Sequence, residues 1–157
     1  MLTSSSPVVT GMTVRTVENR LAMTRSQGSG TVRRTVRRVV VSLETDAGVV
    51  GWGEAAPWTV FSGSVESAAA ALHIHFRPLV IGRPAHAVRS ILDDCRRALA
   101  CSAEAQAALE MALFDILGKS LGVPVHRLLG GAVRTSIPLS FSLADPDLEA
   151  DLRRVRD

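Results

Sequence analysis

The sequence predicts an α+β fold in which a small antiparallel sheet is followed by helices, and three features of the chain indicate it. Apolar and polar residues alternate over residues 39–44, as in a half-buried strand. Turn residues at 46–48 lead from there into a second apolar run, VVGWGE, as in a tight hairpin. Beyond Gly63 the apolar residues recur every three or four positions, which is typical of amphipathic helices.

The sheet is expected to be a three-stranded antiparallel meander. Residues 7–17 are rich in valine and threonine, which favours a first strand. Residues 19–31 contain glycine and serine without a sustained period, and we interpret them as a mobile loop. The strand around residues 39–44 and the strand VVGWGE complete the meander, with the tight hairpin between them.

Two amphipathic helices are expected after the sheet. Pro78 is expected to stop the first helix, and Pro84 is expected to open the second. Each has an apolar stripe at helical spacing, formed in the first by Val65, Ala68, Ala69, Leu72 and Phe76, and in the second by Val88, Ile91, Leu92, Cys95 and Leu99.

A third helix is expected from Ser102, its predicted N-cap, to Gly122, which is followed by the helix breaker Pro124. Asp115 and Lys119 have the i, i+4 spacing of an ion pair on the helix surface. The predicted apolar face consists of Leu109, Ala112, Leu113, Ile116, Leu117 and Leu121. A short helical turn, VHRLL, is expected after it, closed by two glycines.

The C-terminal residues predict a further strand and helix. Residues 137–143, IPLSFSL, read as a strand, and Asp145 and Pro146 are expected to start a helix. That helix has an apolar stripe without an evident partner, formed by Leu148, Leu152 and Val155. Because a single strand and helix cannot bury themselves, we interpret them as the start of a second unit and the chain as the N-terminal part of a longer protein.

Length and composition set the broad class of the protein. The 157 residues suffice for one domain with a buried core, and 46% hydrophobic with 21% charged residues is typical of globular proteins. No apolar run is long enough for a membrane span and no secretory signal is visible, so we expect a cytoplasmic protein. Cys95 and Cys101 lack CxxC spacing, and we expect two mostly buried free thiols.

The net charge of +3 raises the alternative of a nucleic-acid binder, since Arg33, Arg34, Arg37 and Arg38 form a basic block on a predicted strand. No aromatic residues lie between these arginines to stack on bases, and acidic residues follow closely. We therefore favour a solvated strand face and expect neither a nucleic-acid nor a membrane partner.

Known catalytic and metal-binding motifs are missing from the sequence. The nucleotide-loop and serine-hydrolase patterns are absent, and no two histidines have metal-ligand spacing among His73, His75, His86 and His126. Glu54 follows a strand and could be a general base, but no second titratable group lies near it in the sequence. A structural role for Glu54, as a hydrogen-bond acceptor, is favoured.

Three segments resemble the enolase superfamily, and more closely the muconate cycloisomerase-like branch of the mandelate racemase and muconate lactonising group. They are VVVSLETDAGVVGWGEAAPW, AEAQAALEMALFDILGKSLGVPVHRLLGG and IPLSFSLADPD, and their order and spacing carry the resemblance. It implies that residues 1–134 are an N-terminal capping domain, a three-stranded meander with a helical bundle. Residues 135–157 would then be the first strand and helix of a TIM-type barrel.

The resemblance also implies two substrate-facing loops in the capping domain. One contains Ala22, Met23, Thr24 and Arg25, and the other contains Ala55, Ala56, Pro57 and Trp58. Trp58 is then a lid or specificity residue, whereas Trp52, inside a strand, is expected to pack in the core. Ser142 would lie at the C-terminal end of the first barrel strand, either as a substrate contact or as a hydroxyl bonded to backbone.

In this group the barrel abstracts a proton α to a carboxylate and stabilises the product with Mg²⁺. The lysine bases and acidic metal ligands that this requires are not found here, and Lys119 is the one lysine of the chain. We therefore assign no catalytic residue and no metal ligand to this chain, and expect it to be inactive alone.

The resemblance places the parent enzyme among cycloisomerases, epimerases or racemases, and dehydratases. Its substrate would be a small carboxylate or amino-acid-like molecule, and it would form a homo-oligomer. A stand-alone α+β interaction module that has lost the barrel is the alternative. The apolar stripe of the last predicted helix counts against that alternative, because a complete module would cover it.

Overall fold

The computed structural model describes residues 6–22, 25–27, 30–32, 35–139 and 147–156. It consists of two compact units, each described by itself. The first comprises Met1–Val17 and Arg38–Ala132, and the second comprises Glu18–Arg37 and Val133–Asp157. Among the described residues no helix is both long and apolar enough to cross a membrane.

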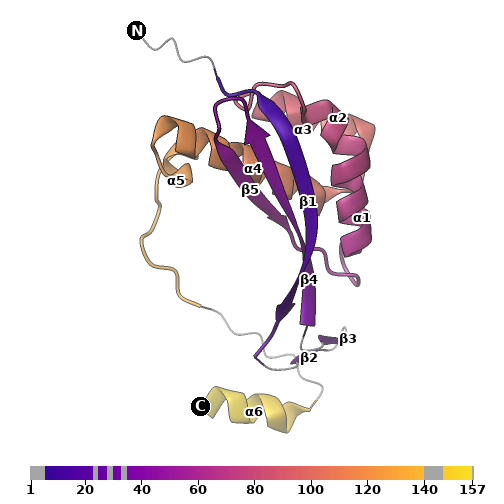
Figure 1. Ribbon diagram of the computed structural model, residues 1–157. Helices are drawn as coiled ribbons and strands as arrows, with labels where there is room; N and C mark the ends of the chain where they lie inside the picture. The colour runs from indigo at the N-terminus through magenta and orange to yellow at the C-terminus, as the bar shows by residue number, and fades with distance from the viewer. Residues whose placement is uncertain (1–5, 23–24, 28–29, 33–34, 140–146, 157) are drawn as a thin grey trace. The chain divides into compact units, whose positions relative to one another are not determined.

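The sheet has three strands in the order β1 (Val9–Arg20), β4 (Thr35–Thr45) and β5 (Val50–Ala55) (Figure 1). β4 and β5 pair antiparallel, and the turn between them contains Gly48 at a φ of 73°, a backbone conformation that favours glycine. The predicted meander and its tight hairpin are therefore confirmed.

One face of the sheet is buried under helices and the other is open. Val39, Val41 and Leu43 of β4 are fully buried against the helices. Successive side chains of a strand point to opposite faces, so Gly51 and Gly53 of β5 share the helix face while Trp52 lies on the open one. Trp52 is 53% exposed, and the prediction that it packs in the core is wrong.

The first helical segment runs without a break through α1 (Val65–Ala70), the π-helix η1 (Ala71–Phe76) and α2 (Arg77–Val80). Pro78 does not stop it, contrary to the prediction. Pro78 lies in the first turn of α2, where a missing N–H is tolerated. The residue before it still belongs to the π-helical hydrogen-bond pattern, because the N–H of Arg77 donates to Leu72 O, five residues back. The predicted stripe is buried at Val65, Ala68, Leu72 and Phe76.

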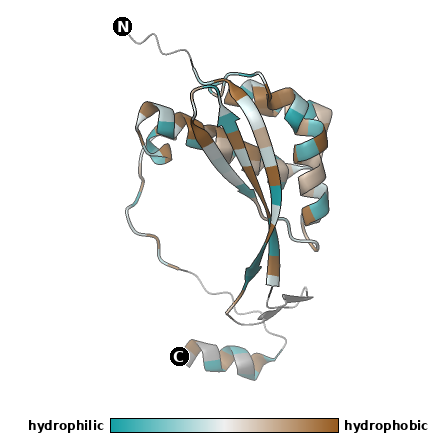
Figure 2. Ribbon diagram, in the orientation of Figure 1, coloured by the Kyte–Doolittle hydropathy of each residue, from teal (hydrophilic) through white to brown (hydrophobic). Residues whose placement is uncertain are grey.

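The helix α3 (Val88–Ala98) begins four residues later than the predicted start at Pro84. Pro84 instead forms a β-bridge with Val8, and the N–H of Val9 donates to Arg83 O. The segment before α3, at Arg83 and Pro84, therefore pairs with the start of β1 and does not form the first turn of the helix. The predicted stripe is buried at Val88, Ile91, Leu92 and Cys95, and polar residues alternate with it along the helix (Figure 2).

The helix α4 (Ala103–Leu121) is the longest of the described helices. It ends as predicted at Gly122, which has a φ of 65°. Ser102 takes the predicted N-cap position, but its hydroxyl donates to Leu99 O instead of capping the helix. The predicted apolar face is buried from Leu109 to Ile116, whereas Leu121 is exposed because it lies in the last turn, beyond the sheet. The turn α5 (Val125–Leu128) follows.

α4 lies unusually close to β5, and the two glycines of the GWG sequence permit this. A Cβ on Gly53 would lie 2.8 Å from the carbonyl carbon of Ala108, and closer still to its oxygen. A Cβ on Gly51 would overlap the carbonyl group of Ala112 in the same way. The alanines that α4 presents here are fully buried, so strand and helix pack nearly backbone to backbone.

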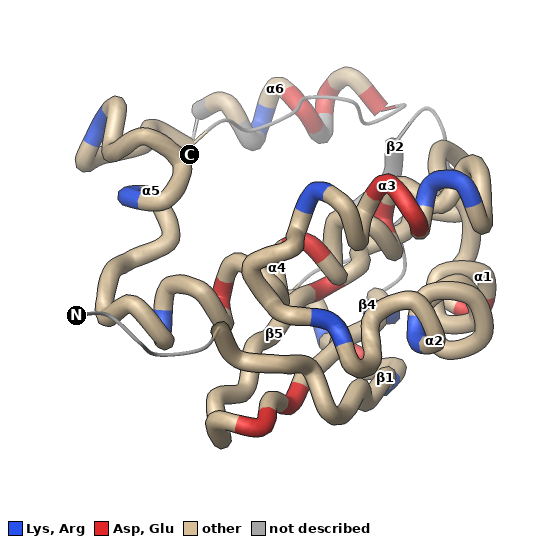
Figure 3. The backbone as a smooth tube through the Cα atoms, turned by 90° about the horizontal axis from the view of Figure 1, so that it is seen from above, with Lys and Arg blue, Asp and Glu red and all other residues tan. Residues whose placement is uncertain are grey.

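Charged residues of opposite sign lie side by side on α3 (Figure 3). Arg83 Nη1 donates to Asp94 Oδ2 at 2.9 Å, and Arg97 bonds the other carboxylate oxygen. These two guanidinium groups hold the pKa of Asp94 below its ordinary value. The network ties the segment before α3 to the helix itself.

Replacing Arg83 with methionine is expected to destabilise the first unit more at neutral pH than at low pH, where only its bond to the Ser90 hydroxyl still counts. The folded-state pKa of Asp94 lies below its unfolded-state value, so its ion pairs stabilise the fold above about pH 4. This contribution is lost as the pH falls through the lower, folded-state pKa. Urea unfolding of both proteins over a pH series measures it. A deficit that stays constant with pH would contradict the assignment to Asp94.

The second unit contains a short antiparallel hairpin, β2 (Arg25–Gln27) and β3 (Gly30–Val32), and the helix α6 (Leu148–Arg156). The prediction of a loop over residues 19–31 is therefore wrong where these strands lie. The predicted strand over 137–143 is also not seen at 137–139, which have no regular secondary structure. A strand needs a neighbour for its hydrogen bonds, and no strand within the described ranges pairs with these three residues. The rest of it, with Asp145 and Pro146, lies outside the described residues.

α6 was predicted from its apolar stripe, and the structure confirms that helix. Leu148, Leu152 and Val155 are exposed.

Candidate functional site

The loop that follows β5 carries four of the predicted substrate-facing residues. Ala55 and Pro57 are buried and anchor the loop to the core, whereas Ala56 and Trp58 are exposed. Trp58 is 38% exposed, so part of the indole lies against protein and part faces outward. The loop therefore presents one partly exposed aromatic ring from a fixed base.

Hydrogen bonds within the loop hold Trp58 in place. Its carbonyl oxygen accepts from the N–H groups of Phe61 and Ser62, both at 2.8 Å. Its own N–H donates to Ser62 Oγ at 3.2 Å. The rings of Trp58 and Phe61 pack edge to face with centroids 5.0 Å apart and an interplanar angle of 76°. The sequence reasoning missed Phe61, although a second aromatic three residues after Trp58 was a usable signal.

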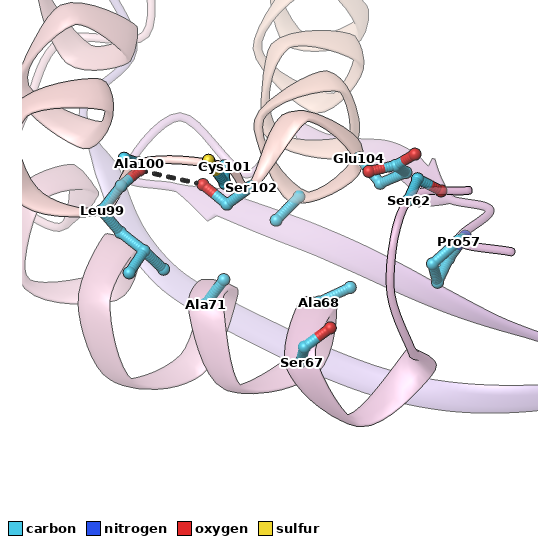
Figure 4. Close-up of a pocket in the computed structure, with 11 residues that line it drawn as sticks. Pro57, Ser62, Ser67, Ala68, Ala71, Leu99, Ala100, Cys101, Ser102 and Glu104 are labelled. Carbon is cyan, nitrogen blue, oxygen red and sulfur yellow. Dashed lines mark hydrogen bonds between the residues drawn. The ribbon is translucent and has the colours of Figure 1, made fainter. Parts of the chain in front are cut away.

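A hollow of about 180 Å³ lies behind this loop (Figure 4). Pro57 and Ser62 border it on the loop side, and small residues of the helices form its other walls. The hydroxyl groups around it are bonded within the protein, as the contact from Ser102 to Leu99 illustrates. Glu104 is the one charged residue among the described residues that line the hollow. It therefore leaves space behind the loop without offering a set of converging polar groups.

The two cysteines differ in environment. Cys95 is fully buried in the core, and this burial raises the pKa of its thiol to about 11. Cys101 is exposed at the rim of the hollow, with a φ of 55°. The expectation of two mostly buried thiols is correct for Cys95 and wrong for Cys101, because the chain turns outward between α3 and α4. No disulfide joins them.

The other predicted loop lies in the second unit. Ala22 is exposed, and Arg25 begins the strand β2. Met23 and Thr24 lie outside the described residues, as does Ser142. The two predicted loops therefore belong to different units.

Glu54 faces the open side of the sheet, where its carboxylate lies 3.5 Å from Arg38 Nε. The side chain of Glu54 is 52% exposed. This ion pair is a structural contact of Glu54. Because it also occupies Arg38, one arginine of the basic block, it favours the interpretation of that block as a solvated strand face.

The described part of the chain offers no magnesium site. Mg²⁺ is held by oxygen ligands in near-octahedral geometry, typically including carboxylates. Among the described residues no group of three His, Cys, Asp or Glu side chains lies close enough to hold a metal ion. This part of the chain does not fit the metal, and no chemical step through Mg²⁺ is derived from it.

Residues 11–130 match the family model described as the N-terminal domain of mandelate racemase / muconate lactonizing enzyme. The chain belongs to this family. The match covers all of the sheet except the first two residues of β1, the described helices of the first unit and the loop with Trp58, and it confirms the resemblance to the enolase superfamily.

Individual relatives agree with this family. The L-Ala-D/L-Glu epimerase of Bacillus subtilis (strain 168) is 35% identical over 122 residues, 75% of this chain and 33% of that protein. A muconate cycloisomerase structure from Azorhizobium caulinodans has a TM-score of 0.76 and 45% identity, covering 98% of this chain and 39% of that one.

A dipeptide epimerase from Enterococcus faecalis V583, solved with Mg and the dipeptide L-Leu-L-Tyr, shares the fold with a TM-score of 0.84 at 21% identity. The match covers 96% of this chain and 41% of that one. This chain spans about a third of the length of the curated relatives that it matches. The capping-domain fold predicted from the sequence, a three-stranded antiparallel sheet with helices, is confirmed.

Proposed function

We propose that this chain is the N-terminal capping region of an enzyme that abstracts a proton α to a carboxylate. The match of residues 11–130 to the family's N-terminal domain carries this proposal. The reaction would be that of a cycloisomerase, an epimerase or racemase, or a dehydratase. Residues 1–134 would form the cap and residues 135–157 the start of the barrel.

In this proposal the loop from Ala55 to Trp58 covers the substrate. The buried Pro57 and the hydrogen bonds around Trp58 support such a role, because a lid must present a side chain in a fixed position. An aromatic face also excludes water from the reacting centre. The loop with Ala22, Met23, Thr24 and Arg25 is likewise proposed to face the substrate, and Ser142 is proposed to contact it.

The substrate is proposed to be a small carboxylate or amino-acid-like molecule, in keeping with the names of the relatives. Mg²⁺ and the catalytic lysines would be supplied by a barrel domain, since the described residues have no acidic cluster for the metal. The 157-residue chain by itself is then inactive, and the complete enzyme is a homo-oligomer.

A chimera tests the proposal directly. Residues 1–134 of this chain would replace the matching part of the Bacillus subtilis epimerase, and α-proton exchange would be followed by NMR in D₂O with Mg²⁺. We expect exchange by the chimera and none by the 157-residue chain. We expect Trp58→Ala to lower kcat/KM about tenfold or more, because it removes a contact to substrate and admits water.

Trp52→Ala is the matched control, since Trp52 is an exposed tryptophan of the adjoining strand on the open face of the sheet. It is expected to leave kcat/KM within about twofold. Equal losses in both variants, or exchange by the isolated chain, would contradict the proposal. A folded chimera without exchange would also count against it.

The alternative of a stand-alone interaction module is less well supported. α6 leaves Leu148, Leu152 and Val155 exposed, whereas a complete module would bury them. Nucleic-acid binding gains no support either, because Arg38 pairs with Glu54.

A further inference from the structure

β5 lies at one edge of the sheet, since the strand order is β1-β4-β5. On its inner side β5 pairs with β4, and on its outer side no strand of the described residues pairs with it. An edge strand presents unpaired N–H and C=O groups, which are a template for pairing with a strand of another chain. β5 has the sequence VGWGEA, an ordinary strand length with Glu54 as its one charged residue, which by itself does little to prevent such pairing.

Two side chains of α4 occupy this outer edge. Asp115 Oδ2 accepts the backbone N–H of Trp52 at 2.9 Å, and Lys119 Nζ donates to the backbone oxygen of Val50 at 2.8 Å. Lys119 Nζ also donates to Asp115 Oδ2 at 2.7 Å. We call Asp115 and Lys119 the edge clamp. The two side chains thus satisfy one outward donor and one outward acceptor of β5, each with a charged and therefore stronger partner.

The edge clamp depends on the close packing of α4 on β5. Asp115 and Lys119 are one helical turn apart, so both side chains project from the same side of α4. Because Gly51 and Gly53 lack side chains, α4 approaches near enough for them to reach the strand backbone. Val50 and Lys119 are 69 residues apart in the sequence, so their contact exists only in the folded chain.

The opposite edge of the sheet is closed in a comparable way. The N–H and C=O of Val9 in β1 pair with Arg83 O and Gly82 N–H, at 2.9 and 2.8 Å. The guanidinium group of Arg77 donates to the backbone oxygen of Met12. Contacts from the helical layer therefore occupy both edges. At β1 they come from the loop at Gly82 and Arg83 and from Arg77 of α2, and at β5 they come from the edge clamp.

We propose that the edge clamp prevents a second copy of this chain from adding its β5 to the sheet. Two β5 strands could pair antiparallel about a two-fold axis at Trp52, which would place Val50 of one copy opposite Glu54 of the other. No like charges would meet in that register, so the strand sequence alone does not oppose it. The edge clamp opposes this pairing, because it already forms hydrogen bonds to the Trp52 N–H and the Val50 oxygen, which the new strand would need.

The test removes the edge clamp from the full 157-residue chain with Asp115→Ala/Lys119→Ala. We expect a dimer whose population rises with protein concentration, measured by size-exclusion chromatography with light scattering. At concentrations where the variant is still monomeric, we expect the Trp52 amide to exchange with solvent about tenfold faster than in wild type. Asp93→Ala/Arg96→Ala is the matched control, since it removes an equally charged pair from α3. The control is expected to behave as wild type in both measurements.

The single variant Lys119→Ala keeps the test valid if the double variant does not fold. It retains the hydrogen bond from the Trp52 N–H to Asp115 and removes only the half-exposed lysine, so it is expected to remain folded. It is expected to form a weaker dimer. A folded variant without Lys119 that stays monomeric at every concentration would overturn the proposal. Equal dimerisation of the Asp93→Ala/Arg96→Ala control would also overturn it.

Discussion

Replacing Gly53 with alanine is expected to lower the free energy of unfolding of the first unit by about 3 kcal/mol or more. The new Cβ would overlap the carbonyl group of Ala108 and lie 3.1 Å from Ala112 N. These are backbone atoms of α4, so they can move aside only if the whole helix shifts away from β5. A shift would also weaken the packing of buried alanines and the edge clamp.

Urea unfolding followed by circular dichroism measures this loss. Gly48→Ala is the matched control, because a Cβ there meets no heavy atom within 4 Å but the residue has a φ of 73°. Gly48→Ala is expected to cost only about 1 kcal/mol, the strain of a left-handed backbone conformation. If Gly53→Ala cost no more than Gly48→Ala, the close approach of strand and helix would be refuted.

Replacing Phe76 with alanine is expected to cost about 3–5 kcal/mol of the free energy of unfolding. Phe76 is the last residue of the π-helix η1, is fully buried, and is among the largest side chains of the core. Truncation would leave a cavity in the hydrophobic core, which the surrounding residues fill only in part. Since domains of this size are stable by about 5–15 kcal/mol, the variant would be close to unfolding.

Ile74→Ala tests the same helix on its other side. Ile74 is 63% exposed, two residues before Phe76 in η1, so its truncation is expected to change stability by less than about 0.5 kcal/mol. Both variants are compared with wild type by urea unfolding at one pH. Similar losses for the two would mean that η1 does not orient its residues as described.

Signals carried by neighbouring residues predicted much of the fold correctly. The alternation in β4 and the turn at Gly48 predicted the hairpin because both act within a few residues. The end of α4 at Gly122 was predicted for the same reason, since the left-handed conformation that closes a helix is a property of glycine itself.

The errors arose where the surrounding structure, near or distant in the chain, changed the meaning of a local signal. Pro78 is a helix breaker in most settings, but the π turn before it supplies a first-turn position that tolerates its missing N–H. Pro84 predicts a helix start, yet its segment pairs with β1 because that edge needs hydrogen-bond partners. Neither requirement can be read from the residues around the proline.

The candidate site was predicted through the resemblance to a family and not from catalytic motifs. That reasoning selected the loop with Trp58, and the structure adds that Phe61 and Ser62 hold the loop in place. Residue order alone does not show which side chains a loop folds back upon.

The sequence by itself determined the antiparallel hairpin, the amphipathic helices and the family, because these depend on residues close together in the chain. Only the tertiary structure decided that Trp52 is exposed, that Gly51 and Gly53 bring α4 onto β5, and that Asp115 closes the strand edge. Asp115 and Trp52 are 63 residues apart, and their hydrogen bond forms only when the chain folds. The face of a strand that becomes buried depends on which helix covers it, and that choice belongs to the whole fold.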